Sequence, residues 1–211
     1  MSKHSAELWS LPRSLQTLVE NELEDGESID WIGQPIVGRY GIRALPIVLF
    51  AVPWTAFALF WMAGAAGFKF PDFGNGIGPE LLFPLFGLPF VLMGVGMLSA
   101  PYWMMRSARR TVYVITDRRA IVFLGSKGGR STTIRSFAPS ELGAITRNQR
   151  ADGSGDVVFC RDASYSSNNG NHRVDIGFLA IPEVKNVEEL VRRMVASANR
   201  VRELQGREYE E

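Results

Sequence analysis

The sequence predicts a membrane protein of the α+β class, in which a two-helix transmembrane hairpin is inserted into a seven-stranded antiparallel barrel capped by a C-terminal helix. Three observations predict this class. Only Lys69, Asp72 and Glu80 carry a charge in the 62 residues between Ala44 and Met105. Seven short segments rich in β-branched and aromatic residues flank this run, one before it and six after it. A C-terminal apolar stripe predicts an amphipathic helix that can cover the open end of a barrel.

Two uncharged segments of 25 residues, 44–68 and 81–105, predict the membrane spans. At about 1.5 Å per residue, each is long enough to cross a hydrocarbon core of about 30 Å. The alternative, a buried hairpin in a soluble core, needs far more surrounding chain than 211 residues supply. The chain then divides into an N-terminal helix with the first strand (1–43), the hairpin (44–105), and the remaining strands with the C-terminal helix (106–211).

The distribution of positive charge predicts the orientation of the hairpin. The connection between the spans carries one cation, Lys69, whereas the outer flanks carry Arg39, Arg43, Arg106, Arg109 and Arg110. Lys and Arg are enriched on the cytoplasmic side of membrane proteins, so we expect both termini in the cytoplasm. The spans contain no Asp, Glu, Lys, Arg or His, which disfavours a transporter or a channel.

The soluble segments are expected to form one short helix, seven strands and a final helix. The helix is expected at 13–23, and the strands are expected at 28–35, 111–116, 119–124, 131–137, 141–149, 156–161 and 172–178. Asp117 is expected to cap the turn between the second and third strands. We expect the segment around Trp31 to pair with strands beyond the second span, because the barrel otherwise keeps an exposed edge.

The final helix is expected to be capped by Asn186, with Glu189 completing a capping box. Its apolar stripe consists of Val187, Leu190, Val191, Met194, Ala198 and Val201. We expect Leu190, Met194 and Ala198 to pack on the barrel, and Arg192, Arg193 and Arg200 to be solvated.

Residues 111–123, TVYVITDRRAIVF, resemble the signature hairpin of the bacterial pleckstrin-homology-like membrane proteins. Residues 20–35, ENELEDGESIDWIGQP, are similar to the segment that precedes the spans in those proteins. The resemblance implies a pleckstrin-homology-like barrel, anchored in the bacterial inner membrane. It implies little about activity, although some relatives are linked to the assembly of membrane complexes.

No residue set predicts a catalytic, cofactor-binding or metal-binding site. The glycine-rich segment 125–130 lacks the GK[ST] ending of a phosphate-binding loop and is expected to be a turn. Cys160 is expected to be an ordinary barrel residue, and His172 a solvated loop residue. One Cys and two His are too few for a structural zinc site. Asp117, Arg118 and Arg119 are expected to serve turn formation and surface solvation.

Basic residues form the one candidate binding surface. Barrel topology returns the 125–130 loop to the end that faces the membrane, where its cations join those flanking the spans. The expected headgroup contacts are Arg39, Arg43, Arg106, Arg109, Arg110, Lys127 and Arg130. Each can contribute about 1 kcal/mol at an anionic leaflet. The alternative is that they are ordinary cytoplasmic-side residues without lipid selectivity.

The expected function is that of a non-enzymatic, membrane-anchored interaction or complex-assembly module at the cytoplasmic face. Its partners are the lipid bilayer and a membrane protein complex or a second copy of the chain. Sensing of anionic headgroups by the basic residues is the main alternative, and an enzyme built from polar barrel residues is a weaker one. A net charge of +1 disfavours nucleic acid as a partner.

Overall fold

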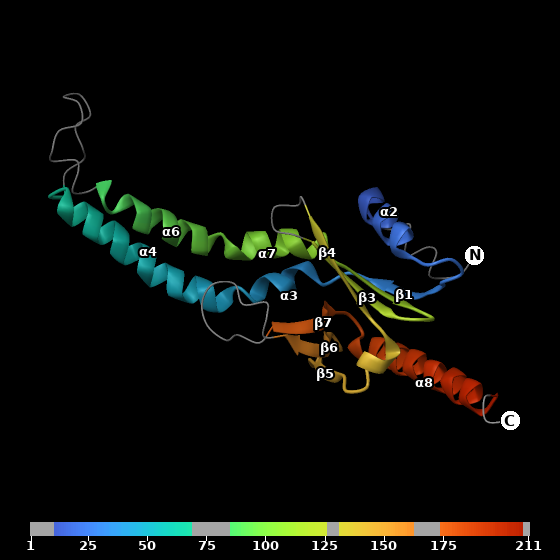
Figure 1. Ribbon diagram of the computed structural model, residues 1–211. Coiled ribbons are helices and arrows are strands. Elements are labelled where there is room, and N and C mark those ends of the chain that lie inside the picture. The colour runs from blue at the N-terminus through green and yellow to red at the C-terminus, as the bar shows by residue number, and fades with distance from the viewer. Residues whose placement is uncertain (1–10, 69–84, 126–130, 163–173, 209–211) are drawn as a thin grey trace. The chain divides into compact units, whose positions relative to one another are not determined.

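The computed structural model describes residues 11–68, 85–125, 131–162 and 174–208. The chain separates into two compact units, shown in Figure 1. One unit combines residues 1–40 with residues 106–211, and the other comprises residues 41–105. The first unit is therefore discontinuous in sequence, with the second inserted into it.

The helical unit consists of two antiparallel apolar helices that run side by side (Figure 1). The first is α4 (Leu45–Ala65), and the second is formed by α6 (Leu88–Leu98) and α7 (Ala100–Ala108). Each is 21 residues long and apolar enough to cross a membrane by length and composition. The first matches the predicted span closely. The second runs from 88 to 108 rather than from 81 to 105, and residues 81–84 lie outside the described part.

A proline explains where the second helix begins. Pro89 is the second residue of its first turn, two positions after the N-cap residue Gly87. Proline favours that position because its fixed φ suits a helix and because the first amides of a helix have no acceptor within it.

Four strands form the first sheet of the discontinuous unit (residues 1–40 and 106–211), which we call the soluble unit because it contains the segments predicted to lie outside the membrane. They are β1 (Ile29–Gly33), β2 (Val112–Thr116), β3 (Ala120–Gly125) and β4 (Thr132–Phe137), antiparallel and in that order. Trp31 is paired with Ile115 across the β1–β2 ladder. This confirms the prediction that the segment before the hairpin pairs with strands beyond it.

Three strands form a second antiparallel sheet in the order β5 (Thr146–Gln149), β6 (Gly155–Asp162) and β7 (Val174–Ile181). All seven predicted strands are present, but the prediction of a closed barrel is wrong. Among the described residues they form two separate hydrogen-bonded sheets. The 3-10 turn at Pro139–Glu141 intervenes where the chain passes from β4 to β5, and β5 is only four residues long.

The core of the soluble unit lies between the two sheets. It includes Tyr113 and Val122 from the first sheet and Phe159 and Phe178 from the second, all buried. The Tyr113 and Phe178 rings are 5.0 Å apart between centroids, and those of Phe159 and Phe178 are 4.8 Å apart. Aromatic residues on facing strands therefore pack the two sheets together, and the Tyr113 hydroxyl also donates to the Leu179 carbonyl at 3.3 Å.

The C-terminal helix α8 (Val184–Glu208) covers this core. Val187, Val191 and Met194 are buried in it, and Leu190 is packed against it, as predicted. Ala198 is only half-buried and is not part of the core cluster. Arg193 and Arg200 are exposed as expected, and the exposed Arg192 donates to Glu188 on the same helix.

The helix begins two residues before the predicted cap. Its first residue, Val184, is fully buried in the core. Asn186 lies inside the first turn, where its amide donates to the Glu183 carboxylate at 2.9 Å. Burial of Val184 thus sets the start of the helix in place of the capping box.

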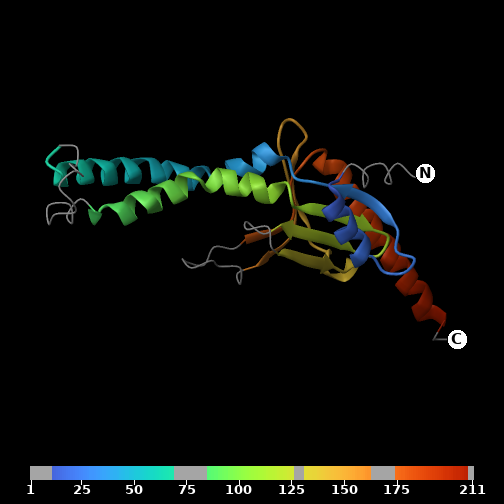
Figure 2. The ribbon, with the colours of Figure 1, turned by 90° about the horizontal axis from the view of Figure 1, so that it is seen from above.

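A second apolar cluster lies on the other face of the first sheet. The short helix α2 (Arg13–Glu22), predicted at 13–23, packs Leu15 and Val19 against Val112, Val114, Ile121 and Phe123. Figure 2 shows α2 across the strands of this sheet. Strands β2 and β3 are therefore buried on both faces, which explains why they read as continuous apolar runs.

Candidate functional site

The structure places the predicted basic residues in different settings. Arg39 lies in the short helix α3 (Val37–Ile42), and Arg106 lies in α7. Arg109 and Arg110 form the turn between α7 and β2. Arg106 and Arg109 are exposed, and Arg110 is half-buried. Arg43 belongs to the helical unit. Lys127 and Arg130 lie outside the described residues.

Arg39 has a protein carboxylate as its partner. Its guanidinium forms an ion pair with Asp152 in the turn between β5 and β6, with Nη1 3.1 Å from Oδ1, and also donates to the Ser154 hydroxyl. Ser154 donates its hydroxyl to Asp152 at 2.8 Å. This hydrogen bond, together with the nearby Arg39 charge, lowers the pKa of Asp152. Arg39 thus fastens the chain that leaves β1 to the second sheet.

Two backbone contacts strengthen this junction. The Ile36 amide donates to the Ala180 carbonyl at 2.7 Å. Ala180 has a φ of +55°, and its amide donates to the buried Asp156 carboxylate at 2.6 Å. A left-handed conformation is unusual for alanine, so this carboxylate helps to hold the carbonyl that receives Ile36.

Gln34 links the segment that leads from β1 to the helical unit with the segment that returns from the helical unit to β2. Its side-chain amide lies 3.4 Å from the Arg109 carbonyl and 3.3 Å from the Thr111 carbonyl. Ser107 donates to the Gly125 carbonyl at 2.6 Å, which fastens the returning chain to β3. The outgoing and returning segments are therefore attached to each other and to both sheets.

The turn between β2 and β3 differs from the prediction. The Thr116 hydroxyl, rather than Asp117, accepts from the following amides, at 3.2 Å from Arg118 and 2.9 Å from Arg119. Asp117 instead accepts from the Ser28 amide at 2.9 Å. A threonine at the end of the strand is already placed to cap the turn, which leaves Asp117 to bind the N-terminal segment.

Arg119 is a partner of a buried carboxylate, not a surface residue. Its side chain is 17% exposed, and that of Glu27 is 0% exposed. Arg119 Nε and Nη2 each lie 2.9 Å from a different oxygen of Glu27, and Nη2 also donates to the Glu22 carbonyl. Thr116 donates to Glu27 at 2.7 Å. We call Glu27, Thr116 and Arg119 the clasp, because they join the N-terminal segment to the β2–β3 hairpin.

The clasp changes the ionisation of both charged members. Burial acts to raise the pKa of Glu27, but hydrogen bonds from Arg119, Glu24 and Thr116 and the Arg119 charge outweigh it, so the pKa falls from 4.5 to about 2. The hydrogen bond to Glu27 raises the pKa of Arg119. The pair therefore stays ionised at neutral pH, with the hydrogen bonds that a buried ion pair requires.

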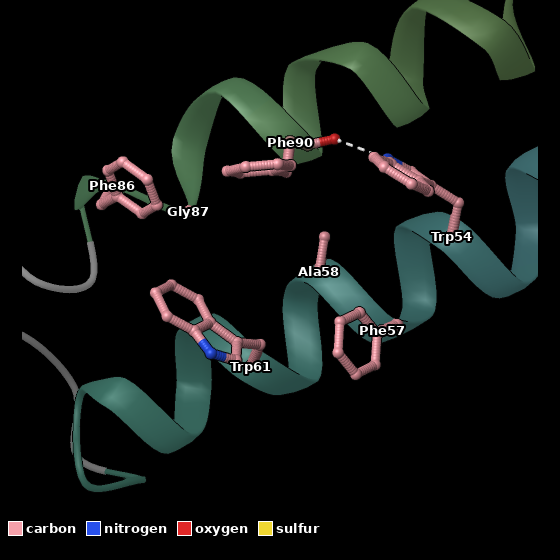
Figure 3. Close-up of a pocket in the computed structure, with 7 residues that line it drawn as sticks. All are labelled: Trp54, Phe57, Ala58, Trp61, Phe86, Gly87 and Phe90. Atoms are coloured by element: carbon pink, nitrogen blue, oxygen red, sulfur yellow. Dashed lines mark hydrogen bonds between the residues drawn. The ribbon is translucent and has the colours of Figure 1, made fainter.

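An apolar cavity of about 260 Å³ lies between the two helices of the helical unit (Figure 3). It is lined by Trp54, Phe57, Ala58, Trp61, Phe86, Gly87 and Phe90. Figure 3 shows Trp54 and Phe90 joined by a hydrogen bond, with the indole nitrogen 3.2 Å from the carbonyl oxygen. None of the lining side chains is an acid or a base, so the cavity suits binding rather than proton transfer.

The cavity was not predicted from the sequence. The available signal was the spacing of Trp54, Ala58 and Trp61, which places a small residue between two large ones on one helix face. The facing residues Phe86, Gly87 and Phe90 repeat that alternation. The clasp was also missed, because nothing in the sequence pairs Glu27 with a residue 92 positions away.

Of the remaining singled-out residues, Cys160 lies in β6 as predicted, with its side chain exposed. His172 lies outside the described residues. The described part of the chain contains no group of three or more His, Cys, Asp and Glu able to hold a metal ion. No family model, curated protein or solved structure matches the chain.

Proposed function

We propose that the chain is a two-pass protein of the bacterial inner membrane, whose soluble unit is a pleckstrin-homology-like module. The module acts without enzymatic activity as a platform for protein interaction or complex assembly at the cytoplasmic face. One observation carries this proposal. The soluble unit is built from chain on both sides of the inserted helices, so two fastened connections hold it at the membrane.

Several features support a pleckstrin-homology-like module. Its expected elements are seven antiparallel strands and a C-terminal helix packed on them, and the soluble unit contains these elements. The two segments that carry the resemblance, 20–35 and 111–123, lie together through the β1–β2 ladder and the clasp.

The two apolar helices and the cations that flank them support membrane insertion with both termini in the cytoplasm. Reporter fusions at residue 75 and at the C-terminus test this topology. We expect the two reporters on opposite sides of the membrane, with the C-terminal one in the cytoplasm. A C-terminal reporter outside the cytoplasm refutes the orientation.

Co-purification tests the assembly role. The tagged full-length protein, extracted from membranes in mild detergent, should retain defined protein partners in fixed ratio. Val191→Asp places a charge in the core of the soluble unit and should lose these partners, whereas the exposed Arg193→Ala should keep them. Equal partner recovery from both variants shows that the soluble unit is not the platform.

Sensing of anionic lipid headgroups is a second candidate function. It is favoured by the exposed side chains of Arg106, in the last turn of the second apolar helix, and of Arg109, directly after that helix. In nanodiscs of defined composition, Arg106→Gln with Arg109→Gln should reduce retention of anionic lipid in native mass spectra. Arg193→Gln with Arg200→Gln removes the same charge from α8 and serves as the control. Equal retention by the two double variants contradicts the sensing role.

A further inference from the structure

We infer that the cavity between α4 and α6 is a binding site for one hydrocarbon chain of a membrane lipid. The inference rests on the proposed membrane insertion and adds a ligand to the helical unit.

Small residues bring the helices together beside the cavity. On α4, Ala51, Thr55 and Ala58 are buried, and Gly94 of α6 faces Thr55 so closely that a Cβ on Gly94 would overlap the Thr55 hydroxyl. Close backbone approach at small residues is typical of paired membrane helices. Further along the pair, the large side chains of Trp61 and Phe86 meet, and they leave space above Ala58 that no side chain of the described residues fills (Figure 3).

The walls of the cavity are aromatic and contact one another. Ring centroids are 6.3 Å apart for Trp54 and Phe90, 5.8 Å for Phe86 and Phe90, and 6.3 Å for Trp61 and Phe86. Because the Trp54 N–H donates to the Phe90 carbonyl, this indole is already satisfied. Water is poorly held in a cavity with apolar walls, so the expected occupant is apolar.

The depth of the cavity along the helices indicates which apolar molecule occupies it. Ala58 lies seven residues before the end of α4 at Ala65, which is about 10 Å along a helix of about 30 Å. This depth falls inside a hydrocarbon core of about 30 Å, where acyl chains are the surrounding medium.

Two measurements on the full-length protein test the site. Native mass spectrometry after extraction in mild detergent should show one lipid retained per chain. In nanodiscs, lipids brominated in the acyl chain should quench the fluorescence of Trp54 and Trp61. Ala58→Leu fills the cavity and should lose the retained lipid and part of the quenching. Ala56→Leu adds the same volume at an exposed position of α4 and should change neither.

Trp61→Ala provides a second variant, because it removes a wall without adding volume between the helices. It should also lose the retained lipid. Overpacking of the helices could explain a loss of lipid in Ala58→Leu, but it could not explain the same loss in Trp61→Ala. Equal lipid retention by Ala58→Leu, Trp61→Ala and Ala56→Leu overturns the inference. So does cross-linking of a protein, rather than lipid, from a photoreactive residue at position 57.

Alkaline carbonate extraction separates this inference from the proposed function. Release of the wild-type protein into the soluble fraction refutes membrane insertion and the lipid site together. A protein that stays in the membrane but retains no lipid refutes the lipid site alone.

Discussion

At the scale of single residues, Glu27 and Arg119 form an ion pair whose contribution to the stability of the fold depends on the hydrogen bonds around it. Taking charges out of water is costly, and the cost is offset only when each partner is well hydrogen-bonded. Glu27 accepts hydrogen bonds from Arg119, Thr116 and the Glu24 amide, so both oxygens of its carboxylate have donors. Removal of either charge then leaves the other poorly compensated.

Glu27→Gln is expected to lower the free energy of unfolding of the soluble unit by roughly 2 to 4 kcal/mol, because it removes the buried carboxylate that Arg119 contacts with two nitrogens. The carboxylates of Glu24 and Glu22 lie farther from Arg119, at 3.7 and 4.0 Å. Thermal unfolding in mild detergent, followed by circular dichroism, measures the change. Glu24→Gln is the control, since the Glu24 side chain is 61% exposed and surface pairs contribute at most about 1 kcal/mol. Similar losses in the two variants contradict the clasp.

The same carboxylate predicts an acid-dependent loss of stability. Its pKa is about 2 in the folded protein against 4.5 for the ordinary group, so the folded state binds the proton less well. The contribution is therefore fully present above pH 4.5 and is lost as the pH falls towards 2; it amounts to about 3 kcal/mol. Unfolding measured between pH 6 and pH 3 should show a shallower decline for Glu27→Gln than for wild type. Parallel declines contradict the assignment.

Gly94 allows a matched test of helix contact. A Cβ on Gly94 would overlap Thr55, whereas a Cβ on Gly96 would meet nothing within 4 Å. Gly94→Ala is expected to destabilise the helix pair by about 1–3 kcal/mol through overpacking. Gly96→Ala should be neutral or slightly favourable. Protease susceptibility of the detergent-solubilised hairpin compares the two variants, and equal susceptibility contradicts the observed helix register.

At the scale of elements, α8 has two different halves. Val187, Val191 and Met194 of the apolar stripe are buried in the core, whereas Val201 at its C-terminal end is 55% exposed. The same apolar stripe therefore stabilises the soluble unit in its first half and stays accessible in its second.

Met194→Ala is expected to lower the free energy of unfolding by about 2 to 5 kcal/mol, because it removes buried methylene and thioether contacts and leaves a cavity. The neighbouring Arg193→Ala should have little effect, since Arg193 is exposed. Denaturant unfolding of both variants in the full-length protein is the measurement. If Met194→Ala instead unfolds like wild type but loses protein partners, the buried half of α8 belongs to the interaction surface.

Elements with strong local patterns could be predicted from the sequence, and elements set by distant contacts could not. The β2–β3 hairpin and α2 lie where their apolar patterns place them. The strand predicted from residue 141 starts only at Thr146, because the chain first makes a 3-10 turn at Pro139–Glu141. The start of α8 followed the burial of Val184 rather than the local capping signal at Asn186.

The candidate sites show the same division. The cations beside the apolar helices are visible in the sequence because charge asymmetry is a local property. The partner of Arg39 is not, because Asp152 lies 113 residues away in the chain. The cavity between α4 and α6 could not be predicted without knowing the register of the two helices. That register places Gly94 opposite Thr55 and aligns the aromatic residues beyond them.

At the scale of the whole molecule, the soluble unit depends on both chain segments that flank the helices. The N-terminal segment supplies β1, one partner of the clasp, and the helix that covers Val112, Val114 and Phe123. Without it, β2 has an open edge and the outer face of the first sheet is exposed, both of which favour aggregation.

Residues 106–211 expressed alone are therefore expected to aggregate or to unfold without cooperativity. Residues 11–40 joined to 106–211 by a flexible Gly/Ser linker, in place of residues 41–105, should form a soluble monomer, because all parts of the discontinuous unit are then present. Size-exclusion chromatography and thermal unfolding compare the two chains. Introducing Glu27→Gln into the linked chain should lower its unfolding temperature, since the clasp lies wholly within this unit. A cooperatively folded 106–211 monomer, with the amides of β2 protected from exchange, shows that the N-terminal segment is an addition to the fold rather than part of it.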